Sequence, residues 1–433
     1  MRWLFPVMIL LSTQMSYGQL PPTRGKLPTQ TIPDSVKTVP DGTEGAVHVV
    51  HSKAAKLPIN EFDNDFSTFK LGLGYNHDFV TYIQDDVFKQ QMDSAGLEFG
   101  PEIKLRDFRV LFTGRLKTKR TLTWKFAYMY DGDKEQWMIR ESGLIVGVPE
   151  LAGHIFIGRT KEGYSMVKVM NGHFPWAAER QMALDPIPIL ADGIKWFGHL
   201  PKSRIFWNLG YFNDVVSKGQ SFSTYKWQYV GRVGWMPFYN KAKNSFLHIA
   251  TNLRYAKPLD GKMTIKSRPE SNPTPQLINT GTFSADESSH IGGEIYFRTG
   301  RLMVGSEFMV HQFYSKSSDN HKYFGGNAVL AYSLTGAVRP YSTDGSFLLF
   351  VPVKNPVFKG GLGEWEAVLN FSTFDLNDGP IKGGKLSRIT PMINWYMSNI
   401  VRMEFVYGYG ILDRYGLKGG IQFFQARIQF TIL

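Results

Sequence analysis

Basic side chains that alternate with apolar ones are the residues of this sequence best placed to do chemistry. Arg109 lies between Phe108 and Val110, and Lys125 follows Trp124. A strand built from such a run would carry two chemically different faces. A guanidinium group matches the paired oxygens of a phosphate or a carboxylate. The polar faces therefore predict the binding of anions rather than the making or breaking of bonds.

Motifs for bond chemistry are not seen in a fitting context. This holds for the HExxH, GxSxG, P-loop and GxGxxG patterns. The chain has no cysteine, which excludes a thiolate metal site and a cysteine nucleophile. His248 and His290 lie in strand-like runs, where a single histidine is more often a wall residue than a ligand. We expect no enzyme and no cofactor. A barrel hydrolase is the alternative, and it would need an exterior Ser–His–acid set that no run shows.

Runs of alternating apolar and polar residues continue from Phe66 to the end of the chain, and sixteen can be distinguished. Each is about ten residues long, as a tilted strand needs to cross a bilayer. Trp and Tyr recur near the ends of the runs, as in the aromatic girdles of membrane barrels. The pattern predicts an all-β fold, a transmembrane antiparallel β-barrel of about 16 strands over residues 66–433.

The connections between the runs should alternate between short turns and longer loops. Residues 397–399 form a tight turn, and longer Gly-, Asp- and Lys-rich loops are expected near Pro380 and Gly416. Residues 335–361 break the alternation, because this connection is long where a short turn is expected.

The first 65 residues have a different composition. Residues 1–18 resemble a secretory signal peptide, with Arg2, a mostly apolar stretch and small residues before Gln19. An N-terminal membrane anchor is the alternative. Residues 19–65 are rich in Pro, Thr and Lys and predict a flexible periplasmic segment, either a plain linker or a docking segment.

The formal net charge of +12 favours anionic partners. Lys and Arg are spread along the chain rather than gathered in a stripe or a tail, and no nucleic-acid-binding motif is visible. Nucleic acid is therefore not an expected partner.

Several segments resemble the phosphate-selective porin O and P family. Residues 334–341 (LTGAVRPY) are similar to its LTGE-x-R-x-Y signature, and residues 360–378 to its GGxGAWExxxRxSxxDLND run. Residues 383–385 and 393–396 resemble its GG(K/R) and NWY elements. Ala337 and Asn370 depart from the family pattern, which weakens the implied phosphate selectivity. The resemblance implies a trimeric, sixteen-stranded barrel in the outer membrane of a Gram-negative bacterium, and the family shares the long connection at 335–361.

Residues 162–192 are expected to fold inward as the third loop of the barrel, because barrels of this size otherwise leave an open channel. Family resemblance at Lys161 and at residues 179–180 implies that this loop forms the constriction. Lys161, Lys168 and Arg180 would set the anion preference, and Arg159 would support the root of the loop. The alternative is a surface loop with ordinary solvated charges.

Alternation also predicts which charged side chains point into the barrel. The predicted acidic residues are Asp107, Glu294, Glu307, Glu366 and Glu404. The predicted basic residues are Arg109, Arg115, Lys125, Arg204, Arg232, Arg254, Arg298, Arg402 and Arg427. Of these, Arg109, Lys125, Arg232 and Arg254 are the candidate anion contacts. The alternative role for each is an ion pair that braces the wall.

These observations predict an outer-membrane porin, a passive diffusion channel for inorganic anions such as phosphate or polyphosphate. It would contact outer-membrane lipid and work as a homotrimer. The alternative from another class is a non-conducting outer-membrane barrel with a structural, adhesion or docking role. A secreted β-rich glycan-binding domain is a third reading, and the aromatic-rich outer faces speak against it.

Overall fold

The computed structural model describes residues 60–432 apart from 171, 174, 219–222, 343–344 and 348–350. The predicted signal peptide at 1–18 and residues 19–59 of the predicted periplasmic segment lie outside the described residues. No helix in the described part of the chain is long and apolar enough to span a membrane.

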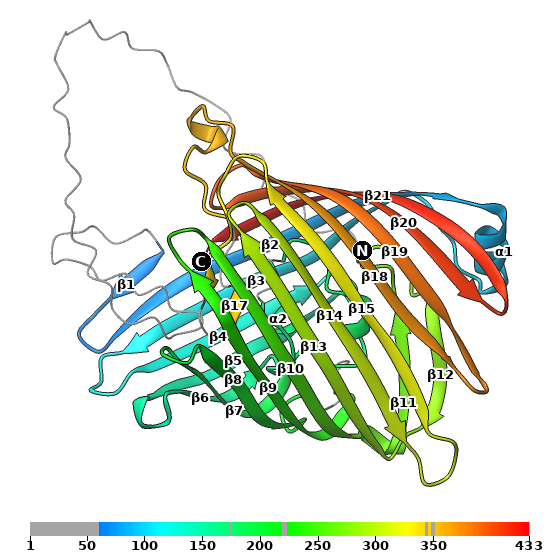
Figure 1. The fold of residues 1–433 in the computed structure, drawn as a ribbon, viewed down its shortest axis with the longest axis horizontal. Helices are drawn as coiled ribbons and strands as arrows, with labels where there is room; N and C mark the ends of the chain where they lie inside the picture. Colours follow the sequence, from blue (N-terminus) through cyan, green and yellow to red (C-terminus); the bar gives the residue numbers. More distant parts are fainter. Residues whose placement is uncertain are drawn as a thin grey trace, which may run out of the picture. The chain divides into compact units, whose positions relative to one another are not determined.

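Sixteen strands of the described chain form one closed antiparallel wall (Figure 1). Each strand pairs with the next one along the wall, and β2 pairs with both β3 and β21, which closes the sheet. The strands are β2 (Ser67–Gln84), β3 (Glu102–Leu116), β4 (Leu122–Asp131), β5 (Gln136–Val148), β6 (Gly153–Thr160), β7 (Ala191–Leu200), β8 (Ile205–Asn213), β9 (Tyr225–Asn240), β10 (Ser245–Pro258), β13 (Glu287–Thr299), β14 (Leu302–Tyr314), β15 (His321–Ser333), β18 (Glu364–Asp378), β19 (Ile381–Tyr396), β20 (Val401–Arg414) and β21 (Leu417–Ile432). The predicted sixteen-stranded barrel is confirmed.

Shorter elements lie in the connections. They are β1 (Glu61–Asp63), which pairs with the start of β2, α1 (Asp86–Ser94), η1 (Pro149–Leu151), α2 (Met166–Val169), η2 (Met182–Leu184), η3 (Leu259–Gly261), the hairpin β11 (Lys262–Ser267) and β12 (Ile278–Ser284), the hairpin β16 (Tyr341–Ser342) and β17 (Ser346–Phe347), and η4 (Val357–Lys359). We call the end of the wall that carries the 161–190 and 259–286 connections the loop end. The opposite end, with the 334–363 connection, is the turn end.

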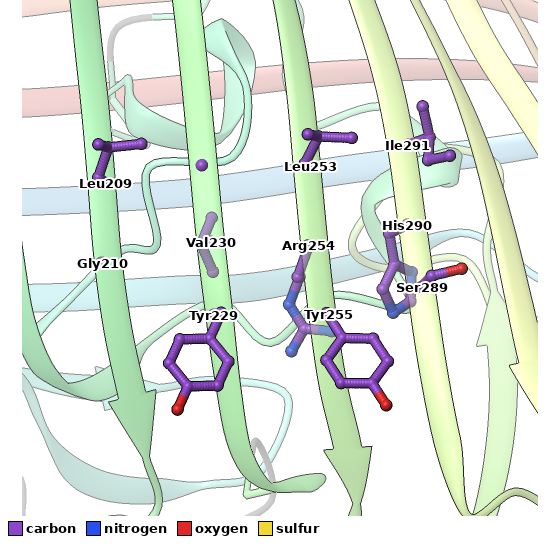
Figure 2. A pocket seen from close by; sticks show the side chains of 11 residues that line it. Leu209, Gly210, Tyr229, Val230, Leu253, Arg254, Tyr255, Ser289, His290 and Ile291 are labelled. Carbon is purple, nitrogen blue, oxygen red and sulfur yellow. The ribbon is translucent and has the colours of Figure 1, made fainter.

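Side chains alternate across the wall as the sequence predicts. In β18, Leu369 and Phe371 are exposed on the outer face, whereas Glu366 and Asn370 are buried on the inner face. Figure 2 shows the same alternation on β10, where Arg254 points to the side of the wall opposite its two neighbours. The outer face is apolar because lipid chains offer no hydrogen bonds.

Two expectations about the connections are wrong. The connections at Pro380 and Gly416 are two-residue turns, because pairing continues to Asp378↔Ile381 and Arg414↔Leu417. Gly379 and Gly416 have φ angles of 52° and 77°, which glycine adopts without strain.

Arg204, which was predicted to point inward from a strand, is not on a strand. It lies in the turn before β8 with a φ of 57°.

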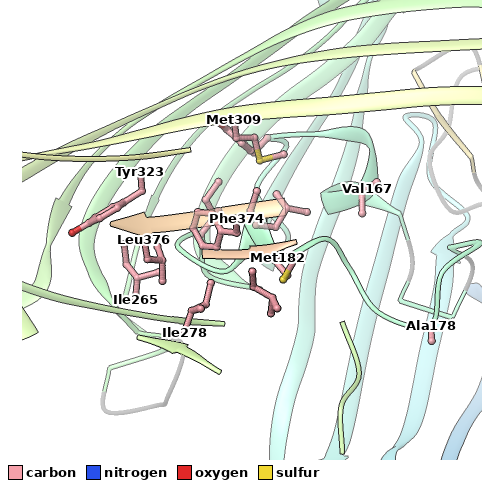
Figure 3. Close-up of a cluster of buried hydrophobic side chains, with 14 of the residues drawn as sticks. Val167, Ala178, Met182, Ile265, Ile278, Met309, Tyr323, Phe374 and Leu376 are labelled. Atoms are coloured by element: carbon pink, nitrogen blue, oxygen red, sulfur yellow. The ribbon is translucent and has the colours of Figure 1, made fainter. Parts of the chain in front are cut away.

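Apolar side chains fill part of the interior at the loop end, where alternation alone predicts polar and charged inner faces. Met182 of the 161–190 connection packs with Phe374 and Leu376 of β18, together with Ile265 and Ile278 of the β11–β12 hairpin (Figure 3). These residues belong to one large buried cluster. Strand periodicity predicts on which face of the wall a side chain lies, but it does not predict which residues pack against that face. Connection residues that cover the inner face therefore cannot be predicted from it.

The 161–190 connection is also fixed to the inner wall by hydrogen bonds. Glu307 accepts from the backbone N–H of Val167 at 3.0 Å and from the side chain of Gln181 at 2.6 Å. His311 contacts the Ala183 carbonyl at 2.9 Å. Wall and connection are therefore one packed unit.

The long connection at 334–363 lies at the turn end, as expected, and its first half enters the interior. Arg339 makes an ion pair with Glu366 at 2.8 Å. The ring of Tyr341 stacks on Phe246 with 4.1 Å between centroids. The Gly345 carbonyl accepts from Arg232 at 2.7 Å.

One buried cation adds to the backbone pairing at the seam between the first and last wall strands. Arg427 of β21 pairs with Asp78 of β2 through two hydrogen bonds of 2.5 and 2.7 Å, and with Glu179 of the 161–190 connection at 2.6 Å. Arg427→Met should lower the free energy of unfolding by about 3–5 kcal/mol, because the buried carboxylate of Asp78 loses its cationic partner and Glu179 keeps only Arg106. Urea unfolding of the purified barrel measures it. The exposed Arg120, which pairs with Glu150, provides the control Arg120→Met with a near wild-type midpoint.

Candidate functional site

Six cationic side chains gather where the 161–190 connection meets the inner face of β3, β4 and β5. We call them the basic cluster: Arg106, Arg109, Lys125, Arg140, Lys161 and Arg180. Three carboxylates lie among them, those of Asp107, Glu141 and Glu179. The cluster therefore carries a formal excess of three positive charges.

Arg109 and Arg140 bring two guanidinium groups together at Gly172. A Cβ atom on Gly172 would lie 3.3 Å from Nη2 of Arg109 and 3.5 Å from Nη2 of Arg140. Arg109 donates to Asp107 at 2.6 Å, and its buried Nε–H has no partner among the described residues. The hydrogen bond of Arg140 within the described chain goes to the Met129 sulfur at 3.2 Å. Each guanidinium has five N–H donors, so donor capacity remains for an anion.

Lys161 and Arg180 face these arginines from the connection. The Lys161 ammonium donates to the Met170 carbonyl at 2.5 Å, and Arg180 donates to the carbonyls of Val167 and Met170 at 3.3 Å. Burial lowers the pKa of Lys161 well below its ordinary value, and the nearby Arg180 adds to the shift. Burial, with the charges of neighbouring arginines, lowers the pKa of Arg180 to about 10. These cations repel one another, and a bound anion would relieve that repulsion.

Two further contacts define the edges of the cluster. Lys125 pairs with Glu141 at 2.9 Å, and both side chains keep solvent access, at 25% and 19% exposure. Arg106 binds Glu179 through Nε at 2.5 Å and Nη2 at 2.8 Å. The pair of Arg106 and Glu179 thus ties the connection to β3.

Arg159 lies at the root of the connection, where the sequence places it. Its guanidinium donates to Asp192 at 2.9 Å, to the Ile139 carbonyl at 2.8 Å and to the Ser217 hydroxyl at 2.9 Å. Asp192 lies in β7, directly opposite Arg159 in the register. This pair joins the two strands between which the connection begins and ends.

Three predicted anion contacts have partners within the protein, as the alternative role of bracing the wall would require. Arg232 is bound by both oxygens of Glu294, at 2.8 and 2.7 Å. Arg254 is bound by Glu162 at 2.8 Å, and Lys168 donates to the Ile187 and Pro188 carbonyls. Alternation predicts that Arg232 and Glu294 both point inward, but it does not predict which side chains pair, nor that Glu162 of the connection reaches Arg254.

Arg106 and Arg140 were missed by the sequence analysis because they lie at irregularities in the wall. The β2–β3 register shifts beside Arg106, which is skipped between Leu105 and Asp107. The β4–β5 register shifts so that residues 140 and 141 lie unpaired between Ile139 and Ser142. A bulge turns a side chain against the alternation, and it leaves no reliable sequence signal. The structure places Met138 and Arg140, two residues apart, on the same buried face of β5.

A shallow depression of the outer wall is not part of this site. It surrounds Gly231 and is lined mainly by outward-facing residues such as Leu209, Tyr229, Leu253 and Tyr255 (Figure 2). Its lining is mostly apolar, which fits the lipid-facing side of the wall.

Lys168 makes stability depend on pH. Burial lowers its pKa from 10.5 to about 7, since the charged ammonium is poorly solvated there. Between these values the unfolded chain binds a proton that the folded chain has lost, so stability should rise with pH from 7 to 10.5. Lys168→Met should remove this rise. Urea midpoints measured across the range test it, with the exposed Lys119→Met as control. Parallel pH profiles for wild type and Lys168→Met would contradict the assignment.

Comparison with known proteins places this geometry in a family. The family described as phosphate-selective porin O and P matches residues 193–432, more than half of the chain. An uncharacterized protein of Caulobacter vibrioides is 31% identical over 141 residues, which are 33% of this chain. The match spans 28% of the length of that relative.

Solved structures share the fold at low sequence identity. OmpT of Vibrio cholerae has a TM-score of 0.56 at 10% identity, with 86% of this chain and 100% of that chain covered. The outer membrane channel DcaP of Acinetobacter baumannii gives 0.55 at 8% identity, covering 86% and 99%. An anion-selective porin from Comamonas acidovorans gives 0.54 at 12% identity, covering 84% and 100%. The chain belongs to the phosphate-selective porin O and P family, and it is an outer-membrane porin of a Gram-negative bacterium.

Proposed function

We propose that this porin is a passive diffusion channel that prefers anions such as phosphate or polyphosphate. The observation that carries the proposal is the basic cluster, in which six cations and three carboxylates lie together where the 161–190 connection meets the wall. The family description and the anion-selective porin from Comamonas acidovorans support the same preference.

Solvent access favours a path beside β4 and β5. Lys125 and Glu141 are partly exposed, whereas Arg109 and Arg140 behind them are buried, as are Arg232 and Arg254 on the far wall. An anion that follows this path meets Lys125 and then the paired guanidinium groups of Arg109 and Arg140. The 161–190 connection forms the other side of the path and acts as the constriction, with Lys161 and Arg180 facing the wall.

The carboxylates in the cluster keep the site from holding an anion too tightly. Asp107 shares Arg109, and Glu141 shares Lys125, so part of the positive charge is already compensated. A channel needs binding that is strong enough for entry and weak enough for release. A net excess of a few charges, rather than a fully uncompensated set, meets both requirements.

The assembly that we propose is a homotrimer embedded in outer-membrane lipid. One structural neighbour, OmpT of Vibrio cholerae, is described in a trimer form. Chemical crosslinking of the detergent-purified protein, followed by mass measurement, tests the subunit number.

A second function, a non-conducting barrel with a structural, adhesion or docking role, is favoured by the packed interior. The 161–190 connection and the β11–β12 hairpin cover the inner wall at the loop end with apolar side chains (Figure 3). Single-channel recording separates the two functions, because a sealed barrel gives no steps of conductance in phosphate or chloride.

Neutralising Arg140 and Arg180 should reduce anion preference without exposing a buried acid. Their hydrogen bonds go to a sulfur and to backbone carbonyls. In Arg140→Gln/Arg180→Gln, the anion-to-cation permeability ratio should fall by about three- to tenfold, equivalent to ~0.7–1.4 kcal/mol. Reversal potentials in planar bilayers under a KCl gradient measure the ratio. Wild-type selectivity should also fall between 0.1 M and 1 M salt, as the screening length shrinks from about 10 Å to about 3 Å.

The matched control is Lys119→Gln/Lys202→Gln, which removes two exposed charges at turns outside the cluster. It should leave the reversal potential unchanged. Equal reversal potentials for wild type and for the cluster variant would rule out the basic cluster as the source of selectivity.

A further inference from the structure

The second half of the 334–363 connection passes along the rim of the wall at the turn end. We call residues 354–363 the rim turn. Its conformation is fixed by backbone hydrogen bonds, from Val357 N–H to the Met397 carbonyl at 2.8 Å and from Gly363 N–H to the Asn355 carbonyl at 3.0 Å. Gly360 has a φ of 81°, a conformation that glycine tolerates. The rim turn is therefore a defined structure that displays particular side chains.

Two large apolar side chains of the rim turn are turned away from the protein. Phe358 is 68% exposed and Leu362 is 78% exposed. Several hydrogen bonds hold this segment in place, so the exposure is a property of the folded chain. Exposed apolar side chains held by a fixed backbone are significant where they extend a larger apolar surface, because such a surface meets another apolar phase.

The position of the rim turn identifies that phase. Trp365 of β18 and Trp395 of β19 stack with ring centroids 4.9 Å apart, and both indole N–H groups donate to the Leu362 carbonyl, at 3.1 and 3.0 Å. These indoles lie on the outer face of the wall, in line with the exposed Leu369 and Ile389. Leu362 thus continues the lipid-facing surface beyond the end of the strands, next to an aromatic pair of the kind found at bilayer interfaces.

The charge of the rim turn agrees with a lipid headgroup as its neighbour. Lys354 and Lys359 are exposed on either side of Val357, and the ten residues 354–363 include no Asp or Glu. Basic side chains beside an apolar surface are attracted to anionic lipid, and the effect extends over about a Debye length. A soluble partner would not require continuity with the lipid-facing wall.

We propose that the rim turn is an interfacial anchor for the leaflet at the turn end. Phe358 and Leu362 insert among phospholipid acyl chains, and Lys354 and Lys359 contact anionic phospholipid headgroups. Short turns of outer-membrane barrels face the periplasm, so this is the phospholipid of the periplasmic leaflet.

The chain has no cysteine, so one introduced cysteine carries a single fluorescent probe. The full-length Phe358→Cys variant, labelled with an environment-sensitive dye, is reconstituted into vesicles of phosphatidylcholine with or without phosphatidylglycerol. The dye in the bilayer-reconstituted protein should emit at a shorter wavelength than the same dye on a free peptide of the turn in detergent-free buffer. It should resist quenching by aqueous iodide and be quenched by nitroxide-labelled acyl chains. Lys243→Cys, on the exposed turn between β9 and β10, is the control and should remain open to iodide.

The headgroup contact is tested in the same system. Phosphatidylglycerol should increase nitroxide quenching at position 358 by about twofold, and Lys354→Gln/Lys359→Gln should abolish that increase. Equal iodide quenching at positions 358 and 243 would overturn the anchor. No response to phosphatidylglycerol would overturn the headgroup contact. Shielding of position 358 that appears only after addition of periplasmic extract would assign the surface to a protein partner and overturn the lipid proposal.

Discussion

The closed wall sends every second side chain into one confined interior, and a charge confined there needs a partner. Most of the buried arginines obey this constraint by meeting a carboxylate from another element. Arg232 meets Glu294, Arg254 meets Glu162, and Arg339 meets Glu366. Each of these ion pairs braces the interior, and its two charges neutralise each other. Among the residues that the structure describes, the basic cluster is a region where the compensation is incomplete, and that surplus gives it its chemical character.

The packed connections add to the effect of the surplus charge. The apolar cluster at the loop end removes water from a large part of the interior. Charges beside such a region are screened less than they would be in a wide aqueous pore. The same connection that supplies Met182 and Leu184 to the apolar cluster also supplies Lys161 and Arg180 to the basic cluster. Packing and electrostatics are thus determined by one segment of chain.

The barrel architecture could be predicted from the sequence because the alternation of apolar and polar residues in a strand is a local property. Alternation located the sixteen strands and the correct outer faces, including Leu369 and Phe371 of β18. It also directed Arg109 and Lys125 inward. The candidate site was only partly accessible. Arg106 depends on a register irregularity, and the distinction between Arg140 and the compensated Arg232 depends on which carboxylate arrives from far along the chain. Such contacts are set by tertiary structure and have no periodic signature.

The link between Asp78 and Arg427 joins residues that are 349 positions apart. Bringing together two groups so far apart costs more chain entropy than closing a hairpin between neighbouring strands. Hairpins of neighbouring strands can form early, whereas the ion pair between Asp78 and Arg427 forms only when the barrel closes. Until then Asp78 lacks its cation, whereas Glu179 can already pair with Arg106 of β3. Circularisation of the wall is consequently the event that buries Asp78 against its partner, and a chain lacking its last strand could not complete it.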